Sequence, residues 1–234
     1  MIAIIAAMDK ELKILLNHMQ IDLIDTIADK IFYQGKLSGK DVIVAKSGIG
    51  KVNAAITTTA LCLKYDIEFI INTGVAGGLF PINSGDIVVS EGVMYSDVDV
   101  VQIDPDLPYG QMPGDPYIVY ADDALVNKTI NTLNQMKFNY RKGIIASGDQ
   151  FVTDSMKLKP LQTVIDHLYA VEMESMSVAI TAFKFNIPFV IIRGISDVID
   201  DTLQVQMYTN SVEDIADMTA SFVISFLEGY RWIE

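Results

Sequence analysis

Four ionisable side chains stand at positions where an α/β protein commonly performs chemistry. Glu11 falls in the first turn of an expected helix, Glu174 precedes a helical run, and Arg193 and Asp197 follow an apolar stretch. Cleavage of a glycosidic bond needs an acid that protonates the leaving group, a base that activates water, and polar groups that hold the sugar. These residues therefore indicate glycoside or nucleoside hydrolysis, which requires no metal.

The acid role sets a condition on Asp197. Its carboxyl must hold a proton near neutral pH, although an exposed aspartate has a pKa of about 3.9, so burial at the strand end has to raise the pKa. A purely structural alternative is an ion pair between Arg193 and Asp197 that fastens a loop. For Glu11 the alternative is a solvated glutamate, because helix dipoles favour acids in the first turn.

The segment before Arg193 explains how these side chains are positioned. Residues 189–192 are apolar, too short for a helix and without polar alternation, which predicts a strand buried on both faces of a parallel sheet. In open α/β sheets, ligands bind at the carboxyl ends of the strands. Arg193, Ser196 and Asp197 follow at that end, so we expect the site there.

Strands and helices alternate along the rest of the chain. Strand patterns occupy residues 2–6, 68–72, 87–90 and 142–147, with a hairpin at residues 31–37 and 41–46. Helical patterns cover residues 51–65, 122–136 and about 211–228. This alternation predicts an α/β fold with a mixed, largely parallel sheet flanked by helices, in a single domain over residues 1–234.

Two loops could bring a ligand close to the chain. Residues 47–51 form a glycine-rich turn between a strand and a helix, but a phosphate-binding Walker loop would need glycine at Ala45 and a hydroxyl at Val52. A tight turn that brings backbone near a ligand is the remaining interpretation. Phe151, in the loop after residues 142–147, could stack on a planar ring or fill the core.

Composition and charge narrow the possible partners. The formal net charge of −13 disfavours nucleic acid and anionic membranes and suits a neutral or cationic small molecule. No apolar run approaches the roughly 20 residues that a membrane span needs. The first residues lack a cationic leader, so we expect a cytoplasmic protein.

The histidines and the cysteine indicate neither metal nor redox chemistry. His18 and His167 have no further ligand at metal-binding spacing, so no metal site is expected. Cys62 lies in an apolar run and is interpreted as a small buried hydrophobic residue. We expect no cofactor.

Six segments occur together in one order along the chain. They are residues 6–8 with Glu11, residues 47–52, 72–78, 147–149, 171–174 and 193–197. In this combination the chain resembles the 5′-methylthioadenosine/S-adenosylhomocysteine nucleosidase family of the purine nucleoside phosphorylase superfamily. The resemblance extends from the first strand to the terminal helix and implies a nucleoside phosphorylase-like fold.

The resemblance implies a role for each ionisable residue. Asp197 would donate a proton to N7 of adenine with help from Ser196, and Glu11 would hold and deprotonate the attacking water. Glu174 would bind the ribose hydroxyls, and Arg193 would support this polar cluster. The products would be adenine and the thio-ribose of methylthioadenosine or S-adenosylhomocysteine.

The resemblance also implies the walls of the site. Phe151 would stack on adenine while backbone groups of Val152 read its edge, and Met8, Ile49 and Met173 would line the sugar side, where the Met173 backbone also binds the ribose. Three features depart from the family pattern, one of which is the loop segment at residues 102–108. Val75 stands where the family usually has a serine, and either Met207 or Tyr208 takes the place of the usual capping phenylalanine.

Family members are homodimers, which implies a homodimer here. The loop around residues 100–113 would reach the neighbouring site, where Val100, Ile103 and Pro113 of the partner subunit would cover the 5′-thioalkyl group. Two rival interpretations remain. One is a phosphate-dependent nucleoside phosphorylase, although the chain has only Arg141, Arg193 and Arg231 to bind phosphate. The other is a non-catalytic nucleoside-binding protein.

Overall fold

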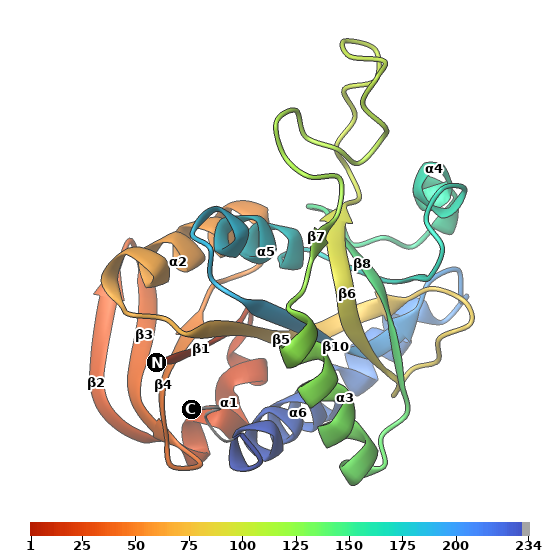
Figure 1. The fold of residues 1–234 in the computed structure, drawn as a ribbon. Helices are drawn as coiled ribbons and strands as arrows, with labels where there is room; N and C mark the ends of the chain where they lie inside the picture. Colours follow the sequence, from red (N-terminus) through yellow and green to blue (C-terminus); the bar gives the residue numbers. More distant parts are fainter. Residues whose placement is uncertain (231–234) are drawn as a thin grey trace.

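A mixed sheet of ten strands forms the centre of the molecule in the computed structural model, which describes residues 1–230. Helices cover both faces of this sheet (Figure 1). The strands are β1 (Ile2–Ala6), β2 (Gln20–Ile27), β3 (Lys30–Leu37), β4 (Lys40–Lys46), β5 (Phe69–Gly78), β6 (Ile87–Tyr95), β7 (Val119–Tyr120), β8 (Tyr140–Ser147), β9 (Leu168–Glu172) and β10 (Phe189–Val198).

Two groups of helices flank the sheet. Helices α1, α3 and α6 pack on one side, where α6 lies along β10, and α2 and α5 pack against each other on the other side (Figure 1). The helices are α1 (Asp9–His18), α2 (Lys51–Lys64), α3 (Asp123–Met136), α4 (Lys159–Gln162), α5 (Ser175–Lys184) and α6 (Gln204–Glu228), with a 3₁₀ turn at Ser155–Leu158. No helix within residues 1–230 is long and apolar enough to cross a membrane.

The parallel strands lie where the sheet is most deeply buried. β4, β1, β5 and β10 are neighbours and run parallel, and all five residues of β1 are buried. Beyond β5 and β10 the strands β6, β8 and β9 return to β5, so this half of the sheet closes on itself. The carboxyl ends of β1, β5 and β10 therefore converge on one edge, as parallel strands must.

Several predicted elements are confirmed. The strand at residues 2–6 has the predicted bounds, the hairpin is β3 and β4, and the apolar run at 189–192 begins the buried strand β10. One strand was missed, and one predicted helix boundary needs correction. The edge strand β2 was not predicted, because it mixes polar and apolar residues and is not buried. Helix α6 begins at Gln204 rather than near residue 211.

The early start of α6 depends on contacts within the turn and on contacts to other segments. The Asp201 Oδ1 atom accepts a hydrogen bond from the Leu203 backbone N–H at 2.8 Å, and Gln204 is buried against other loops. The first turn is thus held by contacts to segments far away in the chain. Residues in this turn alternate between polar and apolar, so hydrophobic spacing could not predict it.

Candidate active site

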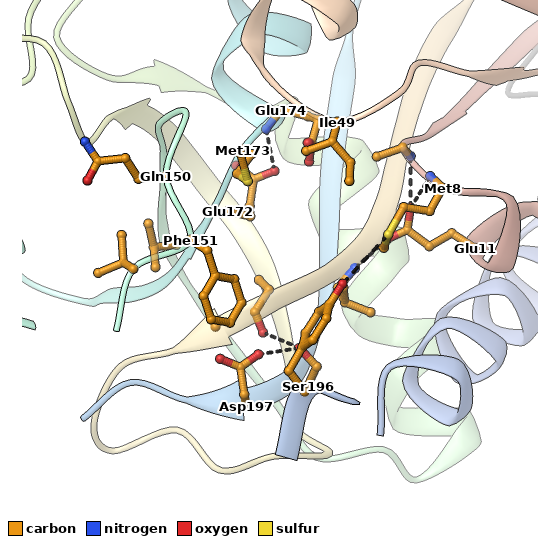
Figure 2. A pocket seen from close by; sticks show the side chains of 17 residues that line it. Met8, Glu11, Ile49, Gln150, Phe151, Glu172, Met173, Glu174, Ser196 and Asp197 are labelled. Atoms are coloured by element: carbon orange, nitrogen blue, oxygen red, sulfur yellow. Dashed lines mark hydrogen bonds between the residues drawn. The ribbon is translucent and has the colours of Figure 1, made fainter. Parts of the chain in front are cut away.

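A pocket opens to solvent at the carboxyl ends of the central strands. Figure 2 shows Phe151 projecting into it next to Asp197 and Ser196, while Met8 and Glu11 approach from another side. The lining is Ala7, Met8, Glu11, Ile49, Val75, Ala76, Gly77, Gln150, Phe151, Val152, Val171, Glu172, Met173, Glu174, Ser196, Asp197 and Tyr208.

Most residues predicted for the site lie in this lining. Of the two candidates for the cap, Tyr208 lines the pocket and Met207 does not. Arg193 lies below the pocket rather than in its wall. The loop positions Val100, Ile103 and Pro113 lie outside the lining of the same chain, and Ile103 is 89% exposed.

Glu11 is held at the pocket by backbone donors that follow β1 and by one donor within β5. Its Oε2 atom accepts hydrogen bonds from the N–H groups of Ala7 and Met8, both at 2.9 Å, and Oε1 accepts one from Val75 at 3.0 Å. The side chain is 2% exposed. Burial raises the pKa of this carboxyl, while the charge of Arg193 and the three backbone bonds oppose the rise. Glu11 is therefore not the solvated glutamate of the structural alternative.

Space beside Glu11 depends on Gly74. A Cβ atom at this position would collide with Arg193 Nη1 and Glu11 Oε1. Only glycine leaves room for both side chains to approach β5 so closely.

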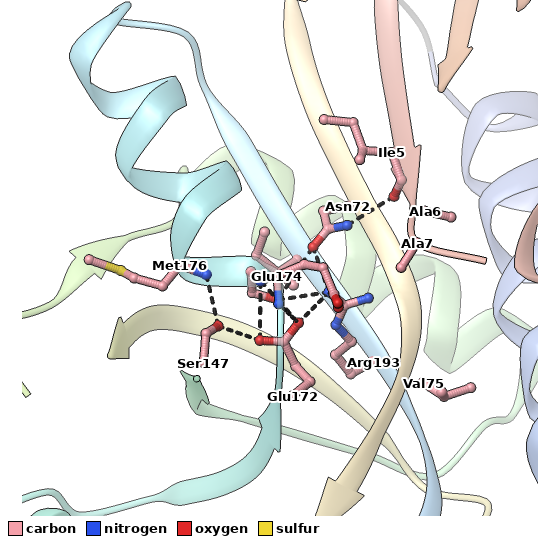
Figure 3. A network of polar contacts seen from close by, with 12 residues as sticks. Ile5, Ala6, Ala7, Asn72, Val75, Ser147, Glu172, Glu174, Met176 and Arg193 are labelled. Atoms are coloured by element: carbon pink, nitrogen blue, oxygen red, sulfur yellow. Dashed lines mark hydrogen bonds and ion pairs between the residues drawn. The ribbon is translucent and has the colours of Figure 1, made fainter. Parts of the chain in front are cut away.

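A polar network lies under the pocket at the start of helix α5 (Figure 3). Arg193 Nη2 donates to Glu172 Oε2 at 2.5 Å, to Asn72 Oδ1 at 2.8 Å and to Ser175 Oγ at 3.0 Å. Ser147 Oγ donates to the other Glu172 oxygen. Within residues 1–230, Arg193 pairs with Glu172 and Glu174 and not with Asp197. The structural alternative, an ion pair between Arg193 and Asp197, is therefore wrong.

A break in strand geometry accounts for this difference. The register of β10 against β5 shifts between Ile195 and Asp197, which marks a bulge. A bulge interrupts the two-residue alternation of side chains, so residues four apart no longer share a face by default. Arg193 is thereby directed to the network and Asp197 to the pocket.

Glu174 connects the network to the pocket. Its Oε1 atom accepts a hydrogen bond from the Gly50 N–H at 2.9 Å, and its Oε2 atom lies 3.8 Å from Arg193 Nη2. Burial, followed by the charge of Glu172, raises the pKa of Glu174 to about 8. The glycine-rich turn at residues 47–51 therefore presents backbone to a carboxyl group, which agrees with its interpretation as a tight turn.

Asp197 lies at the far end of the pocket and is 1% exposed. Ser196 Oγ donates to its Oδ1 atom at 2.6 Å, and Gln204 Nε2 donates to Oδ2 at 2.7 Å. Burial raises the pKa of Asp197, and the two hydrogen bonds reduce the rise. Asp197 is therefore buried near the strand end, as its proposed role as an acid requires.

An aromatic pair forms the open wall of the pocket. The rings of Phe151 and Tyr208 meet nearly edge to face, with centroids 5.4 Å apart, and the Tyr208 hydroxyl lies 3.9 Å from the Met8 sulfur. Phe151 is 46% exposed, so it does not fill the core. Its ring is available to a flat ligand.

Several residues of this site were not predicted from the sequence. Glu172 and Gln204 contact the predicted ionisable groups directly, and Asn72, Ser147 and Ser175 complete the network. Nothing in the local sequence distinguished Gln204, because its partners lie in other segments.

The histidines and the cysteine lie elsewhere. His18 and His167 are exposed and bond Ile14 O and the Tyr169 hydroxyl, and burial raises the pKa of Cys62 to about 11. Within residues 1–230, no group of three or more His, Cys, Asp or Glu side chains is placed to hold a metal ion.

Known proteins resemble the chain over nearly its whole length. The model of the phosphorylase superfamily matches residues 1–228. The 5′-methylthioadenosine/S-adenosylhomocysteine nucleosidase of Bacillus subtilis (strain 168) is 42% identical over 199 residues, which are 84% of this chain and 85% of that protein. The chain belongs to this nucleosidase family. The nucleosidase of Bacillus cereus (strain B4264) is 40% identical over 97% of this chain and 98% of its own length.

Solved nucleosidases share the fold as well as the sequence. The enzyme from Neisseria meningitidis in complex with methylthio-immucillin-A superposes with a TM-score of 0.91 at 31% identity, covering 98% of this chain and 99% of that one. The futalosine hydrolase of Helicobacter pylori strain 26695 superposes with a TM-score of 0.90 at 29% identity, covering 98% and 97%. The futalosine hydrolase therefore has the same fold as the nucleosidases.

Proposed function

We propose that this chain hydrolyses the N-glycosidic bond of 5′-methylthioadenosine and S-adenosylhomocysteine, releasing adenine and the thio-ribose. One observation carries the proposal. Two buried carboxyl groups with raised pKa values, Glu11 and Asp197, line one pocket from different elements. An acid and a base held apart in this way are the parts that glycoside hydrolysis needs.

Asp197 is the proposed general acid. Protonation at N7 withdraws electrons from the glycosidic bond and lets adenine leave as a neutral base. Because burial raises its pKa, Asp197 keeps a proton at a higher pH than an exposed aspartate. The Val152 backbone and the Phe151 ring, both in the pocket wall, would orient adenine so that N7 meets this carboxyl.

Glu11 is the proposed base for the attacking water. Three backbone N–H groups fix both of its oxygens, and the Arg193 charge favours its ionised form. Glu174, next to Glu11, would bind the ribose hydroxyls together with the Met173 backbone. With a pKa of about 8, the Glu174 carboxyl is mostly protonated at neutral pH and can donate to a hydroxyl as well as accept.

The direct test is product analysis in phosphate-free buffer. Purified protein is incubated with methylthioadenosine or S-adenosylhomocysteine, and products are separated by chromatography, with and without added phosphate. Free adenine and the free thio-ribose without phosphate are expected. Adenine only in the presence of phosphate, with a sugar 1-phosphate, would identify a phosphorylase, and no adenine in either case would leave a binding protein. Futalosine should be tested as a further substrate in the same assay, because one structural neighbour is a futalosine hydrolase.

A homodimer completes the proposed site. The segment between β6 and β7 extends far from the body of the molecule (Figure 1), and it carries Val100, Ile103 and Pro113 outside the pocket of its own chain. Val100, Ile103 and Pro113 of the partner subunit would cover the 5′-thioalkyl group. Sedimentation is expected to give twice the 25.8 kDa chain mass, and a lone chain would contradict the dimer.

A further inference from the structure

Gln204 is a buried amide that connects two parts of the pocket from outside it. It is the first residue of α6, is 4% exposed and does not belong to the pocket lining. Its Nε2 atom donates to Asp197 Oδ2 at 2.7 Å and to the Val152 carbonyl at 2.9 Å. The neighbouring Val205 and Gln206 are exposed, so burial singles out this one side chain.

The chemistry of the partners fixes which end of the amide faces them. A backbone carbonyl can only accept a hydrogen bond, so the atom beside Val152 O must be the NH₂ nitrogen. Its two N–H groups are then both used, one on the carbonyl and one on the carboxyl of Asp197. Nε2 has no lone pair to offer, and therefore Asp197 Oδ2 acts as an acceptor toward Gln204.

The other carboxyl oxygen has a different kind of neighbour. Asp197 Oδ1 lies 2.6 Å from Ser196 Oγ, and this hydroxyl also reaches the Ala76 carbonyl at 3.3 Å. A hydroxyl that turns toward Ala76 can accept a hydrogen bond from Oδ1, whereas an amide NH₂ cannot. A proton on Asp197 is accommodated at Oδ1.

We infer that Gln204 is a positioning residue for the general acid Asp197. Gln204 holds Oδ2 as a hydrogen-bond acceptor, leaves the transferable proton on Oδ1, and connects Asp197 to the Val152 backbone. The inference rests on the proposed function for its catalytic meaning, but the contact itself is a property of the unliganded protein. One amide thereby sets the distance between the two groups that would meet adenine.

Few other groups act on Asp197. Tyr208 faces it from α6 and Gly77 from β5, and within residues 1–230 no charged side chain contributes to the shift in its pKa, which comes from burial and from Ser196 and Gln204. Both hydrogen bonds favour the ionised form. Loss of the Gln204 bond alone should therefore raise the Asp197 pKa.

The test compares Gln204→Met, which keeps the side-chain length and removes the donor, with Gln206→Met at an exposed position in the same turn of α6. Carboxyl ¹³C NMR of aspartate-labelled protein follows the Asp197 titration, which Asp197→Asn identifies. We expect the Asp197 pKa to rise by about one unit in Gln204→Met and to stay unchanged in Gln206→Met. An unchanged or lowered pKa in Gln204→Met overturns the inference.

Kinetics supply the functional readout. In Gln204→Met the alkaline limb of kcat/KM should move up by the same interval, and kcat should fall while KM changes little. A fall in kcat without movement of the limb would mean a merely structural role. Gln204→Glu, which keeps size and polarity, decides the question if the methionine variant unfolds, since its carboxyl must also raise the Asp197 pKa. If the wild-type protein released no adenine, the proposed function would fail while the NMR result would still judge the contact.

Discussion

Arg193 and Glu172 form an ion pair that is almost completely shielded from water. Nη2 of the arginine lies 2.5 Å from Oε2 of the glutamate, and the two side chains are 1% and 3% exposed. Glu172 also accepts the N–H groups of Glu174 and Ser175 at the start of α5. A single carboxylate thus binds the arginine beneath the pocket and fixes the segment that carries Glu174.

Removal of the Glu172 charge should be strongly destabilising. In Glu172→Gln, Arg193 would lose its closest counter-ion in a buried position, so we expect a loss of about 3–5 kcal/mol in the free energy of unfolding. Urea denaturation measures it. Asp41→Asn is the control, because it removes an ion pair with Lys36 that is 2.7 Å long and exposed to water, and it should change nothing measurable. Equal stability of the two variants would contradict the account of the network.

The two proposed acid–base groups should each be essential for turnover. Glu11→Gln and Asp197→Asn keep side-chain shape, and each should lower kcat by about 10²- to 10⁴-fold, the usual contribution of one general acid or base. Circular dichroism and thermal melting should show an intact fold. Asp9→Asn, at an exposed position in the same turn as Glu11, and Asp201→Asn, at an exposed position near Asp197, serve as controls with near-normal rates. A near-normal rate in either test variant would remove that residue from the mechanism.

Stability should fall as the pH rises through the titration of Glu174. Its folded pKa of about 8 lies above its ordinary value of 4.5, so between these pH values the folded state holds a proton that the unfolded state has released. The stabilisation is fully present below pH 4.5 and is lost as the pH rises toward 8, at up to about 1.4 kcal/mol per pH unit.

Glu174→Gln provides the matching comparison. The amide has nothing to titrate, so urea midpoints measured from pH 5 to pH 8 should decline less steeply in this variant than in the wild type. Parallel pH dependence in the two proteins would show that Glu174 does not carry the effect.

The cap of the pocket can be assigned by two neighbouring substitutions. Tyr208 lines the pocket and packs edge to face against Phe151, whereas Met207 is outside the lining. Tyr208→Ala should raise KM about tenfold, because it removes an aromatic wall and the support of Phe151. Met207→Ala should leave KM within about twofold. Initial-rate kinetics of both variants measure this, and the reverse order would assign the cap to Met207.

Local sequence determined much of the protein. The apolar run at residues 189–192 has no polar alternation and therefore had to be a buried strand, and the polar residues that follow it had to emerge at the carboxyl end. The same logic placed Glu11 after β1 and Phe151 after β8. These predictions depend only on residues adjacent in the chain, which is why one sequence sufficed for them.

Tertiary structure alone decided how the ionisable groups are paired. Arg193 could have met Asp197 or Glu172, and a bulge in β10 directed it to Glu172. Gln204 became buried only because β10 and the loop after β8 both reach the first turn of α6. Burial and hydrogen bonding of a side chain are set by every segment packed around it, and segments distant in sequence leave no trace in the local pattern of residues.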